Sequence, residues 1–167
     1  MSVDIATPEA GSTTDGPTRD ASLESGKIFI LVERESGKAL MAVGQKAVLQ
    51  ACHDMRALQS MWQWHWHCTV RNGWVTLRNR ITENYLGADF SCQGPRSTVL
   101  ALKVAPCAGA FTGYLVVTRS SGGGQTLSAP YKEDIRQIVG SKEPQALGLG
   151  TYGMTEGIEW EFIRVEP

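Results

Sequence analysis

The sequence lacks several features that would assign a protein to a common functional class. It has no run of five like charges, and 16 Lys and Arg against 17 Asp and Glu leave a formal net charge of -1. This balance gives no electrostatic attraction to nucleic acid or to anionic membranes, so we expect neither as a partner. The start of the chain has no basic segment and no apolar run of seven or more residues. We therefore expect neither a secretory signal nor a transmembrane helix.

Cysteine is scarce, and no Cys-x-x-Cys spacing occurs. The four cysteines lie in or beside apolar segments, at Cys52, Cys68, Cys92 and Cys107. This placement predicts small buried hydrophobic side chains. Together with the missing signal it favours a reducing, cytoplasmic location.

A helical period is missing too, since no window of eleven or more residues carries a helical apolar stripe. Residues 1–25 are rich in Ser, Thr, Gly, Pro, Asp and Ala. They cannot bury enough surface to offset an ordering cost of about 1–2 kcal/mol per residue, so we expect a disordered tail, which is either a flexible leader without a role or a docking or regulatory segment. Residues 26–167 carry short apolar runs separated by Gly, Pro, Asn and Ser, which predicts a nearly all-β domain.

The stretch from Met61 to Val70 is the strongest strand signal in the chain. Alternation along a strand would put its three tryptophans on a buried face and its polar residues on a solvated face. The buried set is Trp62, Trp64, Trp66, Cys68 and Val70, and the solvated set is Gln63, His65, His67 and Thr69. Each indole can bury on the order of 150–250 Å² of surface, so the rest of the chain must build a deep apolar space.

A pattern of four short strands occurs three times along the chain. The first unit comprises 27–33, 38–43, 47–52 and the tryptophan strand; the second 74–79, 85–89, 97–104 and 113–118; the third 125–128, 134–139, 144–149 and 158–165. Three copies at a period of about 45–50 residues are compatible with a solenoid, a propeller or a closed barrel. The strands are too few for propeller blades, and closure removes exposed edges. The prediction is an all-β fold, a β-trefoil of three pseudo-repeats with four strands each.

Four segments also carry a resemblance to known proteins. They are 64–68 (Trp-His-Trp-His-Cys), 72–79 (Asn-Gly-Trp-Val-Thr-Leu-Arg-Asn), 84–89 (Asn-Tyr-Leu-Gly-Ala-Asp) and 157–162 (Gly-Ile-Glu-Trp-Glu-Phe). Over about residues 26–166 the chain resembles the ricin-B-like and fascin-like trefoil families, and most closely small uncharacterised trefoil proteins from filamentous fungi. These motifs are mostly core and turn residues, so they indicate a fold better than a function.

The ricin-B-like resemblance implies a sugar site made by an Asp near each second strand, just after Leu40, Leu86 and Ile138, and an aromatic residue at the end of each third strand. The corresponding positions hold Met41, Gly87 and Val139, and Ala51, Leu102 and Leu149. We therefore expect the usual sugar site to be absent. Asp89 lies two residues beyond its position in the second unit. It is either a replacement acceptor or a cap of its own turn.

His65 and His67 form the only candidate pair of metal ligands. Their spacing would put both imidazoles on one strand face, about 7 Å apart at the backbone. A third ligand would have to come from His53, Asp54 or Asp89. Two polar residues on a solvated face explain the pattern without a metal, so we predict no metal and no cofactor. Both histidines remain candidates for ligand contact.

The sequence contains only weak indications of catalytic residues. The cysteine and histidine neighbours in the sequence would point to opposite strand faces, so they would not touch. Glu159 and Glu161 share a face and could act as acid and base, or they solubilise a terminal strand. Gly122–Gly124 is not followed by a helix-forming segment, so it predicts a connection between units and not a phosphate loop. No residue is assigned a catalytic role, and enzyme activity is left open.

Loop tyrosines supply the last candidates. Tyr131 and Tyr152 lie in or beside longer loops, and an exposed Tyr is a good interface anchor. We predict a monomeric, non-catalytic binding module that recognises a glycan or a protein through its loops. The candidate contacts are Asp89, Tyr131, Tyr152, His65 and His67. The alternative, which the resemblance permits, is a small accessory enzyme or ligand-binding protein in a fungal secondary-metabolite pathway.

Overall fold

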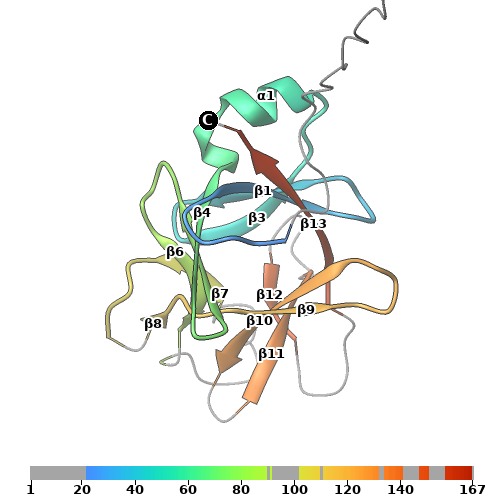
Figure 1. The fold of residues 1–167 in the computed structure, drawn as a ribbon. Helices are drawn as coiled ribbons and strands as arrows, with labels where there is room; N and C mark the ends of the chain where they lie inside the picture. Colours follow the sequence, from blue (N-terminus) through green and yellow to red (C-terminus); the bar gives the residue numbers. More distant parts are fainter. Residues whose placement is uncertain are drawn as a thin grey trace, which may run out of the picture.

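The computed structural model describes residues 22–89, 91, 102–109, 111–131, 134–140, 147–150 and 157–166. Nearly all of this is β-structure (Figure 1). The strands are β1 (Ile28–Glu33), β2 (Ala39–Val43), β3 (Lys46–Gln50), β4 (Trp66–Arg71), β5 (Trp74–Asn79), β6 (Tyr85–Asp89), β7 (Leu102–Ala105), β8 (Phe111–Thr112), β9 (Val116–Arg119), β10 (Gln125–Tyr131), β11 (Asp134–Gly140), β12 (Leu147–Leu149) and β13 (Glu159–Val165). The helical segments are α1 (Met55–Ser60) and η1 (Trp62–Trp64).

Six strands close into a ring. β1 pairs with β13 on one side and with β4 on the other, and β4 pairs with β5. A bridge between Val75 and Leu115 joins β5 to the residue before β9. β9 pairs with β10, and β10 pairs with β13, which completes the circuit. The ring therefore joins the first and last strands of the described chain, which removes the exposed edges that open sheets carry.

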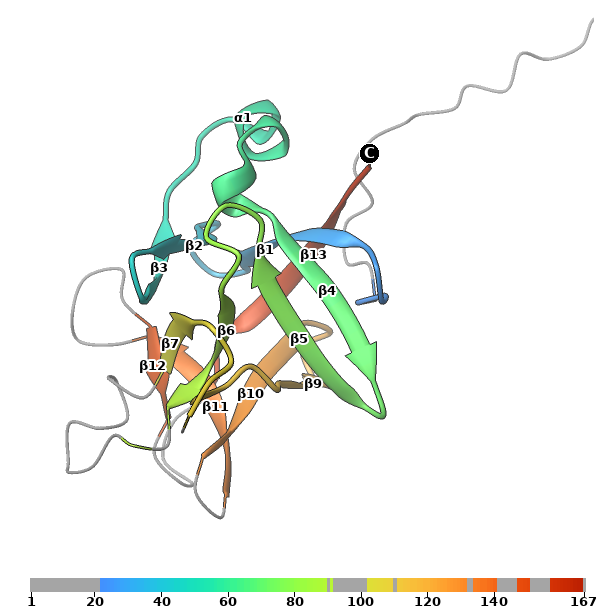
Figure 2. The same ribbon diagram turned by 90° about the vertical axis from the view of Figure 1, so that its left-hand side faces the viewer.

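Three hairpins accompany the ring, one from each unit. They are β2–β3, β6–β7 and β11–β12. The second strand of each hairpin contacts the other two, since β3, β7 and β12 all touch one another. Figure 2 shows the long β4–β5 hairpin side by side with β6, and β7 and β12 close together below β3. Each unit thus supplies two ring strands and one hairpin, as the repeat pattern predicts.

The barrel interior holds the main apolar core. It takes alternate residues from the ring strands, among them Phe29, Trp66, Leu77, Leu127 and Trp160, all 0 % exposed. Side chains alternate between the two faces of a strand, so the residues between these core positions face outward. This alternation decides which side chains are available for binding.

The predicted tryptophan strand is wrong in its first half. The strand begins at Trp66, and Trp62–Trp64 form the turn of η1, with His65 between the two elements. The three indoles therefore occupy different places: Trp66 lies in the main core, Trp64 in a second cluster, and Trp62 is 53 % exposed beneath the Arg80 guanidinium. Val70, expected on the buried face, is 38 % exposed near the end of β4.

The second cluster explains this departure. The residues expected to form a loop before the tryptophans form α1 instead, capped by Asp54, whose carboxylate accepts from Arg56 N at 2.8 Å. Leu58 on α1 packs with Trp64 from η1 and Ile30 from β1 on the outer side of the sheet. A helix lying on the barrel therefore takes Trp64 away from the main core.

The cysteine prediction holds for two of the three described cysteines. Cys68 is buried in the main core, and Cys52 is half-buried against the second cluster. Cys107 is exposed, which corrects the prediction at that position. All three are free thiols, and Cys92 and residues 1–21 of the predicted tail lie outside the described residues. No described helix is long and apolar enough to cross a membrane.

Candidate binding site

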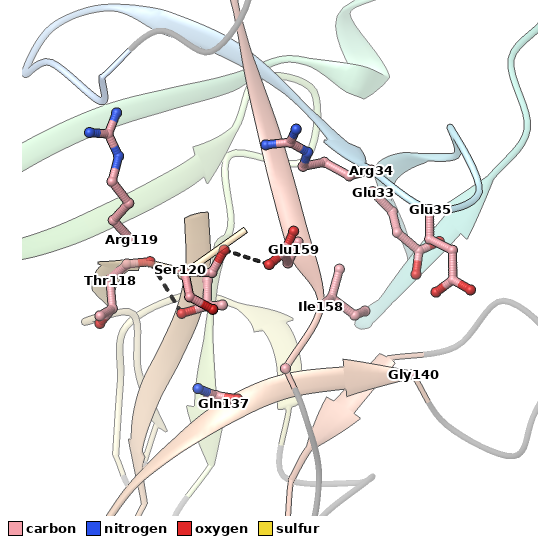
Figure 3. A pocket seen from close by; sticks show the side chains of 13 residues that line it. Glu33, Arg34, Glu35, Thr118, Arg119, Ser120, Gln137, Gly140, Ile158 and Glu159 are labelled. Atoms are coloured by element: carbon pink, nitrogen blue, oxygen red, sulfur yellow. Dashed lines mark hydrogen bonds between the residues drawn. The ribbon is translucent and has the colours of Figure 1, made fainter. Parts of the chain in front are cut away.

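A polar hollow of about 950 Å³ opens where the first and third units meet the end of the second (Figure 3). Its volume is within the range of about 300–1,000 Å³ that ligand pockets usually have. It is lined by Glu33, Arg34, Glu35, Thr118, Arg119, Ser120, Ser121, Thr126, Gln137, Gly140, Gly157, Ile158 and Glu159. These residues come from the end of β1 and its turn, the end of β9, and parts of β10, β11 and β13.

The strand register explains why polar side chains meet in the hollow. Thr118 on β9 is opposite Thr126 on β10, and Thr126 is in turn opposite Glu159 on β13. Opposed residues in an antiparallel pair project from the same face. Their sequence neighbours Leu127 and Trp160 are buried in the core, so this row faces outward. Thr126 is 8 % exposed and forms part of the floor.

Glu159 is the central acceptor of the hollow. Ser120 Oγ donates to Glu159 Oε1 at 2.5 Å, an interaction drawn in Figure 3. The backbone holds this position as well, because Arg34 N donates to Glu159 O at 2.9 Å. Figure 3 shows the Arg34 side chain beside Glu159, and Arg119 on the opposite side of the hollow from Glu35. A carboxylate with one bond to a hydroxyl retains further acceptor capacity for a ligand.

Two glycines let the backbone approach these side chains closely. A Cβ at Gly124 would lie 2.8 Å from Glu159 Oε2 and 3.0 Å from Arg34 Cδ. A Cβ at Gly157 would collide with Gln137 Oε1. The run Gly122–Gly124 does connect two units, and its lack of side chains also shapes the wall beside Glu159.

The lining residues offer a mixture of hydrogen-bond types. Glu159 accepts, Arg34 and Arg119 donate, and the Gln137 amide does both. None of the described residues that line the hollow is aromatic. The arrangement suits a ligand with several hydroxyl groups, since such a ligand can satisfy donors and acceptors together.

Asp89 lies outside the hollow and has partners of its own. One carboxylate oxygen accepts from Lys103 Nζ at 2.6 Å, and the other accepts from Ser91 N at 2.9 Å and Ser91 Oγ at 2.5 Å. The hydrogen bond from Lys103, followed by those from Ser91, lowers the pKa of Asp89 to about 2. This geometry matches the turn cap of the two roles that the sequence left open.

Three of the six positions at which the resemblance implies a sugar site are closed by packing, at Gly87, Leu102 and Leu149, whereas Ala51 is exposed and Met41 and Val139 are half-buried. A Cβ at Gly87 would collide with the backbone of Thr112, so β6 has no room for an Asp there. Leu102 and Leu149, at two of the aromatic positions, are 4 % and 2 % exposed within the core. Packing therefore excludes the usual acceptor in the second unit and the usual platform in the second and third units.

His65 and His67 do not share a face. His67 is exposed on β4, whereas His65 follows η1 and is 1 % exposed, so its predicted solvated position is wrong. His65 Nε2 lies 2.9 Å from Leu58 O. Among the residues that the structure describes, no three His, Cys, Asp or Glu side chains gather as a metal site would require. Asp54, a candidate third ligand, caps α1.

Cys68 and His67 point to opposite sides of β4, as alternation predicts: the thiol is buried and the imidazole is exposed. Burial raises the pKa of the Cys68 thiol to about 12. A thiol that stays protonated near neutral pH is a poor nucleophile. Cys68 is therefore a packing residue.

The two candidate tyrosines give no exposed anchor among the described residues. Tyr131 ends β10, is 1 % exposed and packs in the main core, with the Arg136 guanidinium 4.9 Å from its ring centre. Its predicted role as an exposed anchor is therefore wrong. Tyr152 lies outside the described residues.

Sequence reasoning missed most of the hollow. Glu159 was considered as half of a carboxylate pair, but Arg34, Ser120 and Gln137 carried no signal. They belong to separate segments, and strand pairing alone brings them together. The one local hint was Gly122–Gly124, because a run of glycines permits a close approach of the backbone to other groups.

Comparison with known proteins gives structural likeness without sequence likeness. No protein-family model matches the chain, and no curated protein is similar to it in sequence. A GlcNAcα1-4Gal-releasing endo-β-galactosidase from Clostridium perfringens has a TM-score of 0.63 at 15% identity, over 84% of this chain and 33% of the enzyme. This chain thus spans about a third of that protein.

Two further structures are matched over nearly their whole length. The ricin B-like lectin of Macrolepiota procera, solved in complex with lactose, has a TM-score of 0.61 at 15% identity, over 88% of this chain and 100% of the lectin. The designed three-fold symmetric protein ThreeFoil has a TM-score of 0.60 at 13% identity, over 81% of this chain and 97% of the design. At these identities the likeness concerns the fold alone, and it confirms the prediction that the chain folds as an all-β β-trefoil.

Proposed function

We propose that this chain is a non-catalytic glycan-binding module and that the glycan occupies the polar hollow. The observation that supports the proposal is the convergence of Glu159, Gln137 and Arg34 on one open polar surface. Each sugar ring presents several hydroxyls that both donate and accept, which this mixture of groups matches. A protein ligand would more often use an exposed aromatic or apolar anchor, and the described lining of the hollow has no aromatic residue.

The structural neighbours support the class of ligand. The Macrolepiota procera protein is a lectin solved with lactose, and it shares the whole trefoil with this chain. The site proposed here differs from the one that the family resemblance implies, because Gly87 and the buried Leu102 and Leu149 cannot form that site. The proposal therefore places the glycan in the hollow and not at the acceptor and platform positions that the resemblance implies.

A glycan array followed by titration of the strongest binder tests the proposal. Glu159→Gln keeps the shape of the side chain and removes its charge. We expect it to weaken binding by about tenfold or more, because a hydrogen bond to a charged group contributes about 1.5–3 kcal/mol. Glu161→Gln is the matched control, since Glu161 lies on the same strand and does not line the hollow. No binding on the array, or equal effects of both variants, would contradict the proposal.

The non-catalytic part has its own test. The bound glycan is incubated with the protein and followed by proton NMR of its anomeric signals. We expect these signals to stay unchanged over a long incubation. New anomeric signals that appear with the wild type and not with Glu159→Gln would instead identify an enzyme.

A further inference from the structure

We propose that the ligand is an extended oligosaccharide, which reaches from the hollow across the outer face of β9 to an exposed aromatic pair, Trp74 and Tyr114. This inference rests on the proposed function and specifies its substrate class. It assigns a second subsite to residues that neither the sequence nor the family resemblance singled out for binding.

Trp74 and Tyr114 are two exposed aromatic residues whose rings are in contact. Trp74 begins β5, and Tyr114 lies between β8 and β9; their ring centres are 5.9 Å apart with an angle of 53° between the planes. Trp74 is 37 % exposed and Tyr114 54 % exposed, whereas Trp66 and Trp160 are 0 % exposed. Two solvated rings in contact offer an apolar surface with a polar edge, which suits the apolar face of a sugar ring.

The strand register puts this pair on the same face as the hollow. The bridge from Val75 to Leu115 joins core-facing residues, so their neighbours Trp74 and Tyr114 face outward. Further along β9, Val116 is opposite Ser128, and Ser128 is opposite Gln137 of the hollow. The outer face of β5, β9, β10 and β11 therefore runs continuously from the aromatic pair to the polar groups.

The spacing requires more than one sugar ring. Tyr114 lies two residues before Val116, and Gln137 lies two strands away from it. With about 4.8 Å between strands and about 3.4 Å per residue, the backbones of Tyr114 and Gln137 are roughly 12 Å apart. This separation of the backbones exceeds the width of one ring, so a ligand that lies over both subsites has more than one sugar.

The hollow and the pair are complementary in chemistry. The hollow supplies charged and amide groups without an aromatic platform, and the pair supplies a platform with Arg71 opposite Trp74 on the neighbouring strand. Carbohydrate sites commonly need both an apolar surface and a few placed polar groups. The hollow and the aromatic pair together provide both the polar groups and the apolar surface.

The test uses one glycan in increasing chain length, from the monosaccharide at the binding end of the best array ligand upward. We expect the wild type to bind the longer chains at least about fivefold more tightly, and Trp74→Ala or Tyr114→Ala to remove this gain while leaving monosaccharide binding unchanged. Trp62→Ala is the matched control, because Trp62 is also exposed, at 53 %, but lies on η1 beneath the Arg80 guanidinium and away from the pair. Glu159→Gln should weaken every length.

A second readout avoids dependence on the folding of the variants. The indole N–H signal of Trp74 in the wild-type protein, assigned with Trp74→Phe, should shift with the oligosaccharide and not with the monosaccharide. Affinity that does not rise with chain length, or an unshifted Trp74 signal on oligosaccharide binding, overturns this inference and leaves the hollow intact. Monosaccharide binding that resists Glu159→Gln, or no glycan binding at all, overturns the proposed function, and the inference with it.

Discussion

His65 and His67 are two positions apart in the sequence but differ in their exposure to solvent and in their surroundings. His67 is exposed on β4, while His65 is packed between α1 and the barrel. Leu58 O can only accept, so His65 Nε2 must carry the proton. Nδ1 is buried without a hydrogen-bond partner among the described residues. A second proton would therefore add a charge and an unpaired donor in an apolar place.

We predict that His65 makes the stability of the protein depend on pH. Burial is the main cause that lowers the pKa of His65 below its usual 6.5, and the nearby Arg80 adds to the effect. The unfolded chain then binds a proton at a higher pH than the folded chain, so the free energy of unfolding falls as the pH drops below about 6.5. The fall ends below the folded pKa, where both states are protonated.

Urea unfolding between pH 8 and pH 5 measures this dependence. His65→Gln keeps a donor for Leu58 O and removes the titrating ring, so its profile should be flatter than that of the wild type. His67→Gln is the matched control and should follow the wild type. Identical slopes for all three proteins would show that the buried imidazole does not control the profile.

At the scale of elements, the β4–β5 hairpin depends on a tight turn at Asn72 and Gly73. Both residues have positive φ values, 51° and 80°. An Asn-Gly pair in this conformation forms the turn whose twist matches two antiparallel strands. The turn also positions Trp74, the first residue of β5.

We predict that Gly73→Ala destabilises the protein by about 1 kcal/mol, because a Cβ is disfavoured at positive φ. A Cβ there would meet no atom within 4 Å, so the cost is conformational and not steric. Gly140→Ala is the matched control, since that Cβ also meets nothing within 4 Å and the φ of Gly140 is not positive. Chemical denaturation should show a loss for the first variant and none for the second; equal losses would contradict the turn argument.

The strands that were predicted best are those in which buried and exposed residues alternate regularly and no neighbouring element changes this pattern. β5 and β6 have the predicted bounds, because their apolar residues alternate and clear turn residues flank them. The strand prediction failed in the first half of the tryptophan segment because the spacing of its tryptophans fits both a strand and a turn of helix. Packing of Trp64 against Leu58 decided between them, and a single sequence does not show which residues will meet across elements.

At the scale of the whole molecule, the three-fold repeat made the fold predictable while the site was not. Core positions recur in each unit, so Trp66 and Trp160 signal equivalent strands. The hollow instead joins the end of β1 to β9, β11 and β13, and its residues repeat in no other unit. Such a site is created by the pairing of strands that are distant in the sequence, so no local sequence motif predicts it.

The same pairing determines where the folded domain begins. The residues before β1 contact the ring: Leu23 packs against the main core, Ser25 Oγ accepts from Val70 N at 3.2 Å, and Gly26 N donates to Cys68 O at 2.8 Å. The Glu24 carboxylate lies 3.8 Å from the guanidinium of Arg164 on β13; because Glu24 is exposed, this ion pair contributes little to stability. Through these hydrogen bonds, the residues just before β1 are held against β4.

We predict that two truncations will differ sharply. Removal of residues 1–21 should leave the free energy of unfolding unchanged, because their composition predicts a tail that adds no core. Removal of residues 1–26 should cost about 2 kcal/mol, since it also deletes two hydrogen bonds and the partly buried Leu23. Urea titrations of both chains and the full-length protein measure this difference. If the shorter deletion already lowers stability as much as the longer one, residues 1–21 contact the barrel, and the tail prediction is wrong.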